Sequence, residues 1–290
     1  MVVMLTVVIG FTSALIYGSA DFLGGLAARR MSAVLVTAIA ALTGLVVLLV
    51  AMPFFGGTWS AGAVLLGAAS GVSGAIAIGL LYACLAVGPM SILSPLTAVV
   101  TAIVPLTIGL IGGEQLGTIG YVALGLAVVA VVMVGFVPEK GAVRPTLKAV
   151  LMAVGSGTAI GTILVIIDAA PDDSGLIPLV FNRAVNAAIM FTIVGITVVM
   201  ARRRNSGPAH ATWRDGLYLA IACGVVDTIA NVGLLIGVRL GDLSVMAVLT
   251  ALYPTGTIIL AAVVLRERIA PVQYAGLVLA VAAGAMLALN

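Results

Sequence analysis

The chain has 290 residues, of which 63% are hydrophobic and only 8% charged, and its mean hydropathy is +1.32. Water-soluble domains carry roughly 25% charged residues, so a soluble fold of this composition would expose far too much apolar surface. The composition therefore excludes a soluble globular protein and predicts an all-α protein that crosses a membrane several times. The net charge of +3 comes from basic residues scattered over polar breaks, which predicts membrane lipids rather than nucleic acid as their partners.

Apolar runs of about twenty residues, the length that crosses a bilayer as an α-helix, alternate with short polar breaks along the chain. The first run begins at Val2 without a basic segment before it, so we expect a first membrane span rather than a cleaved signal peptide. The pattern predicts ten transmembrane helices, at residues 2–20, 33–52, 62–84, 90–111, 118–137, 147–168, 177–200, 215–237, 243–265 and 271–289.

The richest polar break, at residues 138–146, divides the chain into two halves of five helices, 1–137 and 147–290. The halves resemble each other at a constant offset of 153 residues, the separation of Gly88 from Gly241. Further pairs at this offset are Ser91 and Ser244, Thr97 and Thr250, Glu114 and Glu267, and Tyr121 and Tyr274. Because five is an odd number, the second half must enter the membrane in the opposite sense. Inverted repeats of this kind are typical of secondary transporters.

Three segments carry a resemblance to a known family. Each half closes with a Gly-Glu-like turn and a final helix, "GGEQLGTIGYVALGLAVV" and "LRERIAPVQYAGLVLAVA", and the first helix contains "IYGSADF". These segments resemble the EamA-type transporters of the drug/metabolite transporter superfamily. The resemblance implies two five-helix EamA-like repeats on a scaffold with varied cargo, often exported metabolites or drugs. Arg266 departs from it, since a glycine is usual there, and so does Tyr17, where tryptophan is common.

Polar side chains within or beside the first span are candidates for function, because burying them costs free energy that packing alone does not require. Asp21 follows the first predicted span. It either takes part in transport or forms an ion pair with Arg29 or Arg30. Tyr17 either lines a cavity or packs at an interface.

Prolines and carboxylates occupy related places in the two halves. Pro105 lies inside the fourth predicted helix and Pro254 inside the ninth, where each frees a carbonyl group and permits a kink. Glu114 and Glu267 come just before the final helix of each half, where a carboxylate stabilises the positive helix N-terminus. We therefore expect both glutamates to be structural caps.

The seventh predicted helix begins with "LVFNRAVNAAI". Asn182 and Asn186 lie one turn apart on one face, with Arg183 beside them. An arginine at this depth needs a carboxylate, carbonyl groups or water. The candidate partners near it in sequence are Asp168 at the end of the preceding helix and Asp172 and Asp173 in the connecting loop. The family resemblance also implies an arginine in this region. Two interpretations remain: a contact to substrate or gate, or a static ion pair or a side chain that extends to the surface.

The eighth predicted helix contains "CGVVDTIANVG", in which Asp227 and Asn231 share one face. One hypothesis is that Asp227 faces a central cavity, titrates during transport, and carries a proton or holds a cationic substrate. The other is that a protonated Asp227 forms a hydrogen bond with a neighbouring helix and only stabilises the packing.

Together these features favour a secondary transporter of the bacterial inner membrane that moves a small metabolite or drug-like solute outward by alternating access, with protons as a second partner. The alternatives are a passive channel or membrane scaffold, and a membrane-embedded enzyme that modifies lipid. A Gly-x-x-x-x-Gly-Lys-Ser/Thr loop is absent from the sequence, so ATP does not drive the protein directly. With one histidine in a polar break and two cysteines in apolar runs, we expect no metal, no other cofactor and no enzymatic activity.

The orientation in the membrane is open. Most of the 13 Lys and Arg residues fall in odd-numbered connections between the predicted helices or at their edges. Basic connections usually stay in the cytoplasm, which places both termini outside it. The family resemblance instead implies that both termini are cytoplasmic. A reporter fused to the C-terminus would decide between these orientations.

Overall fold

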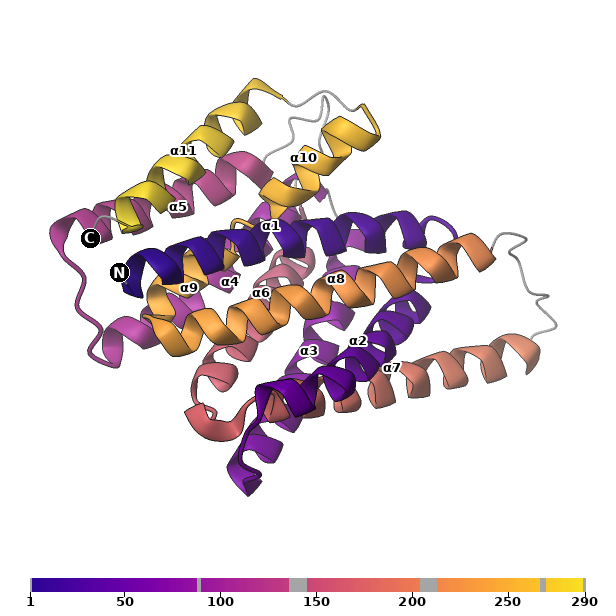
Figure 1. Ribbon diagram of the computed structural model, residues 1–290. Coiled ribbons are helices and arrows are strands. Elements are labelled where there is room, and N and C mark those ends of the chain that lie inside the picture. The colour runs from indigo at the N-terminus through magenta and orange to yellow at the C-terminus, as the bar shows by residue number, and fades with distance from the viewer. Residues whose placement is uncertain (1, 88–89, 136–144, 204–212, 267–269, 289–290) are drawn as a thin grey trace.

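The computed structural model describes residues 2–87, 90–135, 145–203, 213–266 and 270–288, which form an α-helical bundle without strands (Figure 1). The helical segments are α1 (Val2–Ala28), α2 (Ala33–Phe55), α3 (Ala61–Val87), α4 (Met90–Ile111), α5 (Thr118–Gly135), α6 (Leu147–Asp168), the short 3-10 turn η1 (Asp172–Ser174), α7 (Ile177–Arg203), α8 (Trp213–Leu240), α9 (Leu243–Thr250), α10 (Pro254–Val264) and α11 (Pro271–Ala288).

All ten predicted spans correspond to helices of the structure. In the described part of the chain, seven stretches are long and apolar enough to cross a membrane, and one of them combines α9 with α10. The other three predicted spans appear as shorter apolar helices within α4, α5 and α11. The first helix is longer than predicted, because α1 continues through Asp21 to Ala28 without a proline to end it. Asp21 therefore lies inside a helix rather than after one.

The ninth predicted span is broken into α9 and α10, where the sequence predicted only a kink at Pro254. Proline has no N–H to donate, and the backbone before it forms tight turns instead of α-helical ones. The Tyr253 N–H, for example, donates to the Thr250 carbonyl oxygen at 3.0 Å. In contrast, α4 continues without interruption past Pro105. The two prolines therefore produce different backbones in the two halves.

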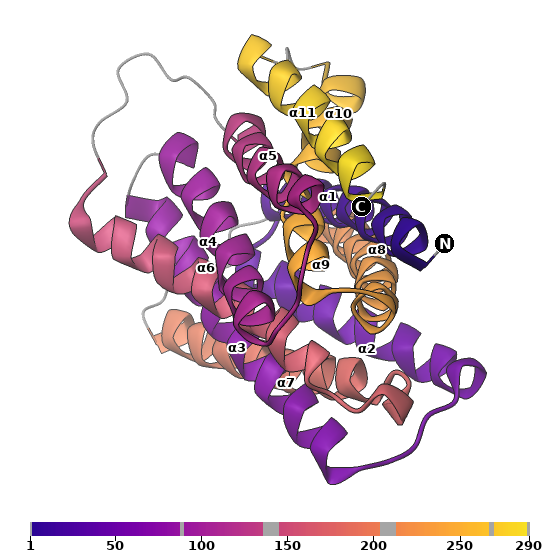
Figure 2. The same cartoon turned by 90° about the vertical axis from the view of Figure 1, so that its left-hand side faces the viewer.

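Helices from the two halves are interleaved. α1 packs along α8, α3 along α6 and α7, α2 against both α7 and α8, and α5 along α11. Both ribbon views show α5 beside α11 at the edge of the bundle (Figures 1 and 2). Small residues allow the helices to approach closely: a Cβ on Gly157 of α6 would lie 2.6 Å from the Thr97 carbonyl oxygen of α4. This close approach is typical of helix packing in membranes, where small side chains line the contacts.

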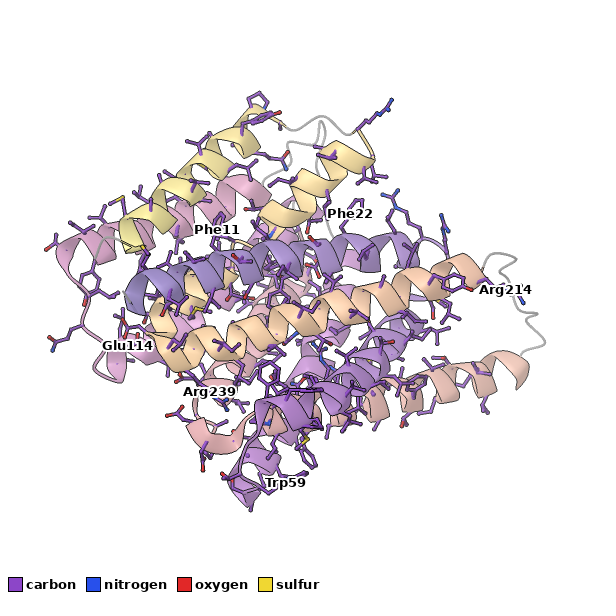
Figure 3. The ribbon with its side chains drawn as sticks, in the orientation of Figure 1. Phe11, Phe22, Trp59, Glu114, Arg214 and Arg239 are labelled. Atoms are coloured by element: carbon purple, nitrogen blue, oxygen red, sulfur yellow. The ribbon has the colours of Figure 1, made fainter. Side chains whose placement is uncertain are left out.

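The bundle has distinct ends. α1 and α8 run antiparallel, so that Gly216 at the start of α8 lies against Arg30 after α1. Figure 3 shows Arg214 at this end and Glu114 at the opposite end, and Figure 1 places both chain termini on the Glu114 side. Arg30 and Arg214, which border two of the odd-numbered connections, therefore lie at the same end of the molecule.

Two loops close against each other near the end of α8. Gly175 has a φ of 54° and meets the backbone of Gly56 so closely that no side chain fits between them. The Thr58 N–H donates to the Asp173 carbonyl oxygen at 2.8 Å, and the Thr58 hydroxyl also bonds the Asp173 carboxylate. Arg239 of α8 donates to a serine hydroxyl of η1 at 2.9 Å. These contacts link the α2–α3 loop, η1 and α8.

Glu114 caps a helix of the opposite half. Its carboxylate oxygens accept hydrogen bonds from the backbone N–H groups of Leu243 at 2.7 Å and Ser244 at 3.0 Å, in the first turn of α9. The sequence predicted a cap on the final helix of its own half, whereas the packing of α4 against α9 brings the Glu114 carboxylate to α9. Glu267 lies outside the described residues. The Glu114 carboxylate thus connects the two halves at a helix N-terminus, where negative charge is stabilising.

Glu114→Gln is expected to lower the free energy of unfolding by about 1 kcal/mol, because a neutral amide with one acceptor oxygen interacts less favourably with the helix N-terminus. Thermal unfolding of the detergent-solubilised protein measures the loss. Asp242→Asn is the matched control at the same helix start, because the Asp242 side chain makes no capping hydrogen bond.

The sign expected for this control follows from the surroundings of Asp242. Burial, and then repulsion from Glu114, raise the pKa of the Asp242 carboxyl above its ordinary value. A raised pKa in the folded state means that stability is lost as the pH rises through the range in which Asp242 ionises. Asp242→Asn should therefore leave stability unchanged or slightly raise it at neutral pH. Equal losses in the two variants would contradict the capping role of Glu114.

Candidate functional site

An ion pair at the centre of the bundle joins α7 to α8. The Arg183 Nη2 group donates to a carboxylate oxygen of Asp227, and the two side chains are 14% and 23% exposed. The sequence suggested Asp168 as the nearest partner of Arg183, but Asp168 ends α6, and the guanidinium reaches α8 instead. Two side chains that were singled out separately are thus bonded to each other.

A glycine of α2 makes room for this pair. α2 packs against both α7 and α8. A Cβ on Gly44 would lie 3.4 Å from Arg183 Nε and 2.5 Å from Thr228 Oγ1. The absence of a side chain therefore lets Arg183 extend past α2 to Asp227. Gly44 could not be singled out from the sequence, because the chain has 35 glycines and no local pattern distinguishes this one.

Asn231 and Tyr17 form the next layer between α8 and α1. Asn231 Nδ2 donates to the Asp227 backbone carbonyl at 2.7 Å, one turn earlier on the same helix. The Asn231 side chain is also hydrogen-bonded to the Tyr17 hydroxyl. The structure therefore brings Tyr17, Asn231, Asp227 and Arg183 into one connected group.

Asp21 faces this group from α1. Asp21 lies one turn after Tyr17 on the same face of α1. Its carboxylate interacts electrostatically with the Asp227 carboxylate and with the Tyr253 side chain. The Asp21 side chain is exposed, and no hydrogen bond or ion pair connects it to another residue in the described ranges. The arginines proposed from the sequence as its partners follow the end of α1, about two turns further along. Asp21 is thus a second carboxylate beside this group, without a basic partner among the described residues.

Asn182 and Asn186 face a different neighbour. Asn182 Nδ2 donates to Ser70 Oγ of α3 at 2.8 Å. Asn186 is only 6% exposed and lies against Gly74 of α3, while its Oδ1 atom has no hydrogen-bond partner among the described residues. Both asparagines therefore join α7 to α3, whereas Arg183 on the adjacent face of α7 reaches α8.

The interruption between α9 and α10 borders the same part of α1. Gly18 lies directly against the backbone of Tyr253, and Thr257 Oγ1 donates to the Gly18 carbonyl oxygen at 2.9 Å. Many transporters use interrupted helices to bring backbone polar groups to a site near the membrane midplane. From the sequence, Pro254 indicated where the helix bends, but not that Gly18 of α1 packs against the interruption.

The arrangement supports binding and proton exchange. It combines an ion pair, a second carboxylate and tyrosine hydroxyls, which can hold a charged or hydrogen-bonding solute or exchange a proton. No group of three His, Cys, Asp or Glu side chains in the described part of the chain could hold a metal ion.

Comparisons with known proteins extend this description. Residues 147–289 match the EamA-like transporter family. A protein of known crystal structure has a similar fold, with a TM-score of 0.70, 17% sequence identity, and coverage of 97% of this chain and 95% of that chain. At this identity the similarity shows the fold alone. No curated protein matches the sequence.

Proposed function

We propose that the chain, whose residues 147–289 match the EamA-like transporter family, is a multi-pass membrane transporter, and specifically a secondary carrier working by alternating access. Its cargo is a small metabolite or drug-like solute, exported across the inner membrane as the resemblance of its closing segments implies. The observation that carries the proposal is the ion pair of Arg183 with Asp227, because it joins two helices at the centre of the bundle.

Two inverted repeats explain the packing. Each helix of one half has a counterpart in the other half: α1 and α6, α2 and α7, α3 and α8, α4 and α9–α10, and α5 and α11. When every helix is exchanged for its counterpart, the main helix pairs are converted into one another. The pair α1–α8 becomes α6–α3, and the pair α2–α8 becomes α7–α3. Individual glycines follow the same exchange. Gly18 of α1 packs on the Tyr253 backbone before α10, and Gly161 of α6 packs on the Thr101 carbonyl of α4. Two related halves of this kind provide the two alternative arrangements that a carrier needs.

The ion pair acts as the gate in this proposal. Arg183 stays protonated at all accessible pH values, so Asp227 is the partner that can change its charge. A proton on Asp227, or a solute that binds its carboxylate, weakens the attraction to Arg183 and frees α7 to move relative to α8. Conversely, release of the proton restores the pair. Transport is thereby coupled to protons through one carboxylate.

The test is counterflow in proteoliposomes, using the first solute that accumulates from a panel of labelled amines, amino acids and nucleosides. We expect saturable exchange that a pH gradient drives in the wild-type protein. Arg183→Ala should impair it, and Arg183→Lys should rescue it only in part, because lysine lacks the planar fork of the guanidinium. Unchanged kinetics in Arg183→Ala would remove the gate. Flux without saturation would contradict a carrier and indicate a channel.

A further inference from the structure

The charged groups at the centre of the bundle do not balance. Arg183 is paired with Asp227, so its positive charge is already neutralised. Asp21 interacts electrostatically with Asp227, and no hydrogen bond or ion pair joins it to another described residue. When all three side chains are ionised, this group carries one uncompensated negative charge, which is costly within a membrane.

Asp21 has tyrosines on both neighbouring elements. Tyr17 lies one turn before it on α1, and Tyr253 comes from the interruption between α9 and α10; both interact with Asp21 electrostatically. Gly18 brings the two elements together, since a Cβ at this position would lie only 2.7 Å from the Cα atom of Gly256. The fold thus places an exposed carboxylate beside two tyrosine side chains, one from α1 and one from the interruption between α9 and α10.

We propose that Asp21, with Tyr17 and Tyr253, binds the cationic group of the transported solute, an amine or quaternary ammonium group. This assignment rests on the proposed carrier function and adds the substrate class to it. A carboxylate offers a cation a strong charge-assisted contact, and the faces of tyrosine rings attract cations. A solute with one positive charge also cancels the excess negative charge, so that the loaded carrier changes its arrangement without an unpaired charge in the membrane.

Other charged ligands fit this position less well. An anionic solute would meet two carboxylates, Asp21 and Asp227, and the only nearby guanidinium is occupied within the described residues. A metal ion would need further oxygen, nitrogen or sulfur ligands, and no cluster of three such acidic, histidine or cysteine side chains occurs in the described part of the chain. A proton on Asp21 is the remaining competitor. It should displace a permanent cation as the pH falls.

Choline and its neutral carbon isostere, dimethylbutanol, are suitable probes, because they differ mainly in charge. Binding to the purified protein in detergent is measured by isothermal titration calorimetry. We expect the wild-type protein to bind choline at least about tenfold more tightly than the isostere, as one charge-assisted contact predicts. Acidic buffer should weaken the binding of choline and leave that of the isostere unchanged.

Variants assign the effect to individual groups. Asp21→Asn should reduce choline affinity about tenfold, while Asp21→Glu retains most of it. Tyr253→Phe keeps the aromatic ring and should bind choline like the wild type, whereas Tyr253→Leu should bind several-fold more weakly. Asp242→Asn is the control for loss of a carboxylate elsewhere and should not change the affinity. Size-exclusion chromatography verifies that each variant is folded.

Two results would overturn the proposal: equal affinity of the wild type for choline and dimethylbutanol, or unchanged choline affinity in Asp21→Asn. If Asp21→Asn does not fold, the preference for choline over its isostere and the two Tyr253 variants decide. None of these results affects the carrier function, which depends on counterflow. Conversely, choline binding without any counterflow would contradict the carrier while leaving the cation site in place.

Discussion

Asp227→Asn is expected to destabilise the protein more than Arg183→Gln, although each substitution removes one charge of the same ion pair. In Asp227→Asn the Arg183 guanidinium loses its partner and cannot lose its own proton, so an unpaired charge stays in the membrane. Breaking a buried pair in this way costs about 3 kcal/mol, at the low end of the usual range because both side chains keep some exposure. Glutamine at 183 leaves Asp227 free to bind a proton, and its loss should be about 1 kcal/mol.

Thermal unfolding of the two variants in detergent checks this order. The double variant Arg183→Gln with Asp227→Asn is the control, because it removes both charges and keeps amides that can form hydrogen bonds. It should be more stable than Asp227→Asn alone, giving a coupling energy of roughly 1–3 kcal/mol between the positions. If the two single losses simply add, the side chains do not stabilise each other in the folded protein.

The helices and their order follow from the sequence, because hydropathy over about twenty residues directly reflects the thickness of a bilayer. The start of α6 at Leu147 and its end at Asp168 match the predicted span, since a polar break stands on each side. The end of α1 does not match. Asp21 is a polar residue inside α1, and a hydropathy pattern reads such a residue as a break.

The partners of the polar side chains could not be predicted from the sequence. Arg183 and Asp227 are 44 positions apart on two helices that both pack against α2, and the space for their ion pair depends on Gly44. Similarly, Glu114 caps α9 because helices of the two halves are interleaved, which no local signal indicates. Residue type and depth thus selected side chains that the structure brings into contact, whereas their pairing is a property of tertiary packing.

Gly18→Ala is expected to lower the free energy of unfolding by about 3 kcal/mol, the upper part of the range for overpacking. The new Cβ would lie 2.6 Å from the Thr257 nitrogen and 2.7 Å from the Gly256 Cα, and it would also collide with the Tyr253 carbonyl oxygen. All of these are backbone atoms, which cannot rotate away as a side chain does. Relief therefore requires α1 to move away from the interruption between α9 and α10.

Gly25→Ala is the matched control on the same helix, because a Cβ there meets nothing within 4 Å. Alanine is the better helix former, so this variant should be more stable than the wild type by about 0.5–1 kcal/mol. The same chemical change thus has opposite effects two turns apart on α1, as thermal unfolding of the two proteins in detergent would show. A loss in both variants would mean that glycine itself matters to α1, and no loss at Gly18 would mean that α1 and the interruption are not in close contact. Because Asp21 lies one turn beyond Gly18, a displaced α1 should also slow counterflow in Gly18→Ala, while Gly25→Ala transports normally.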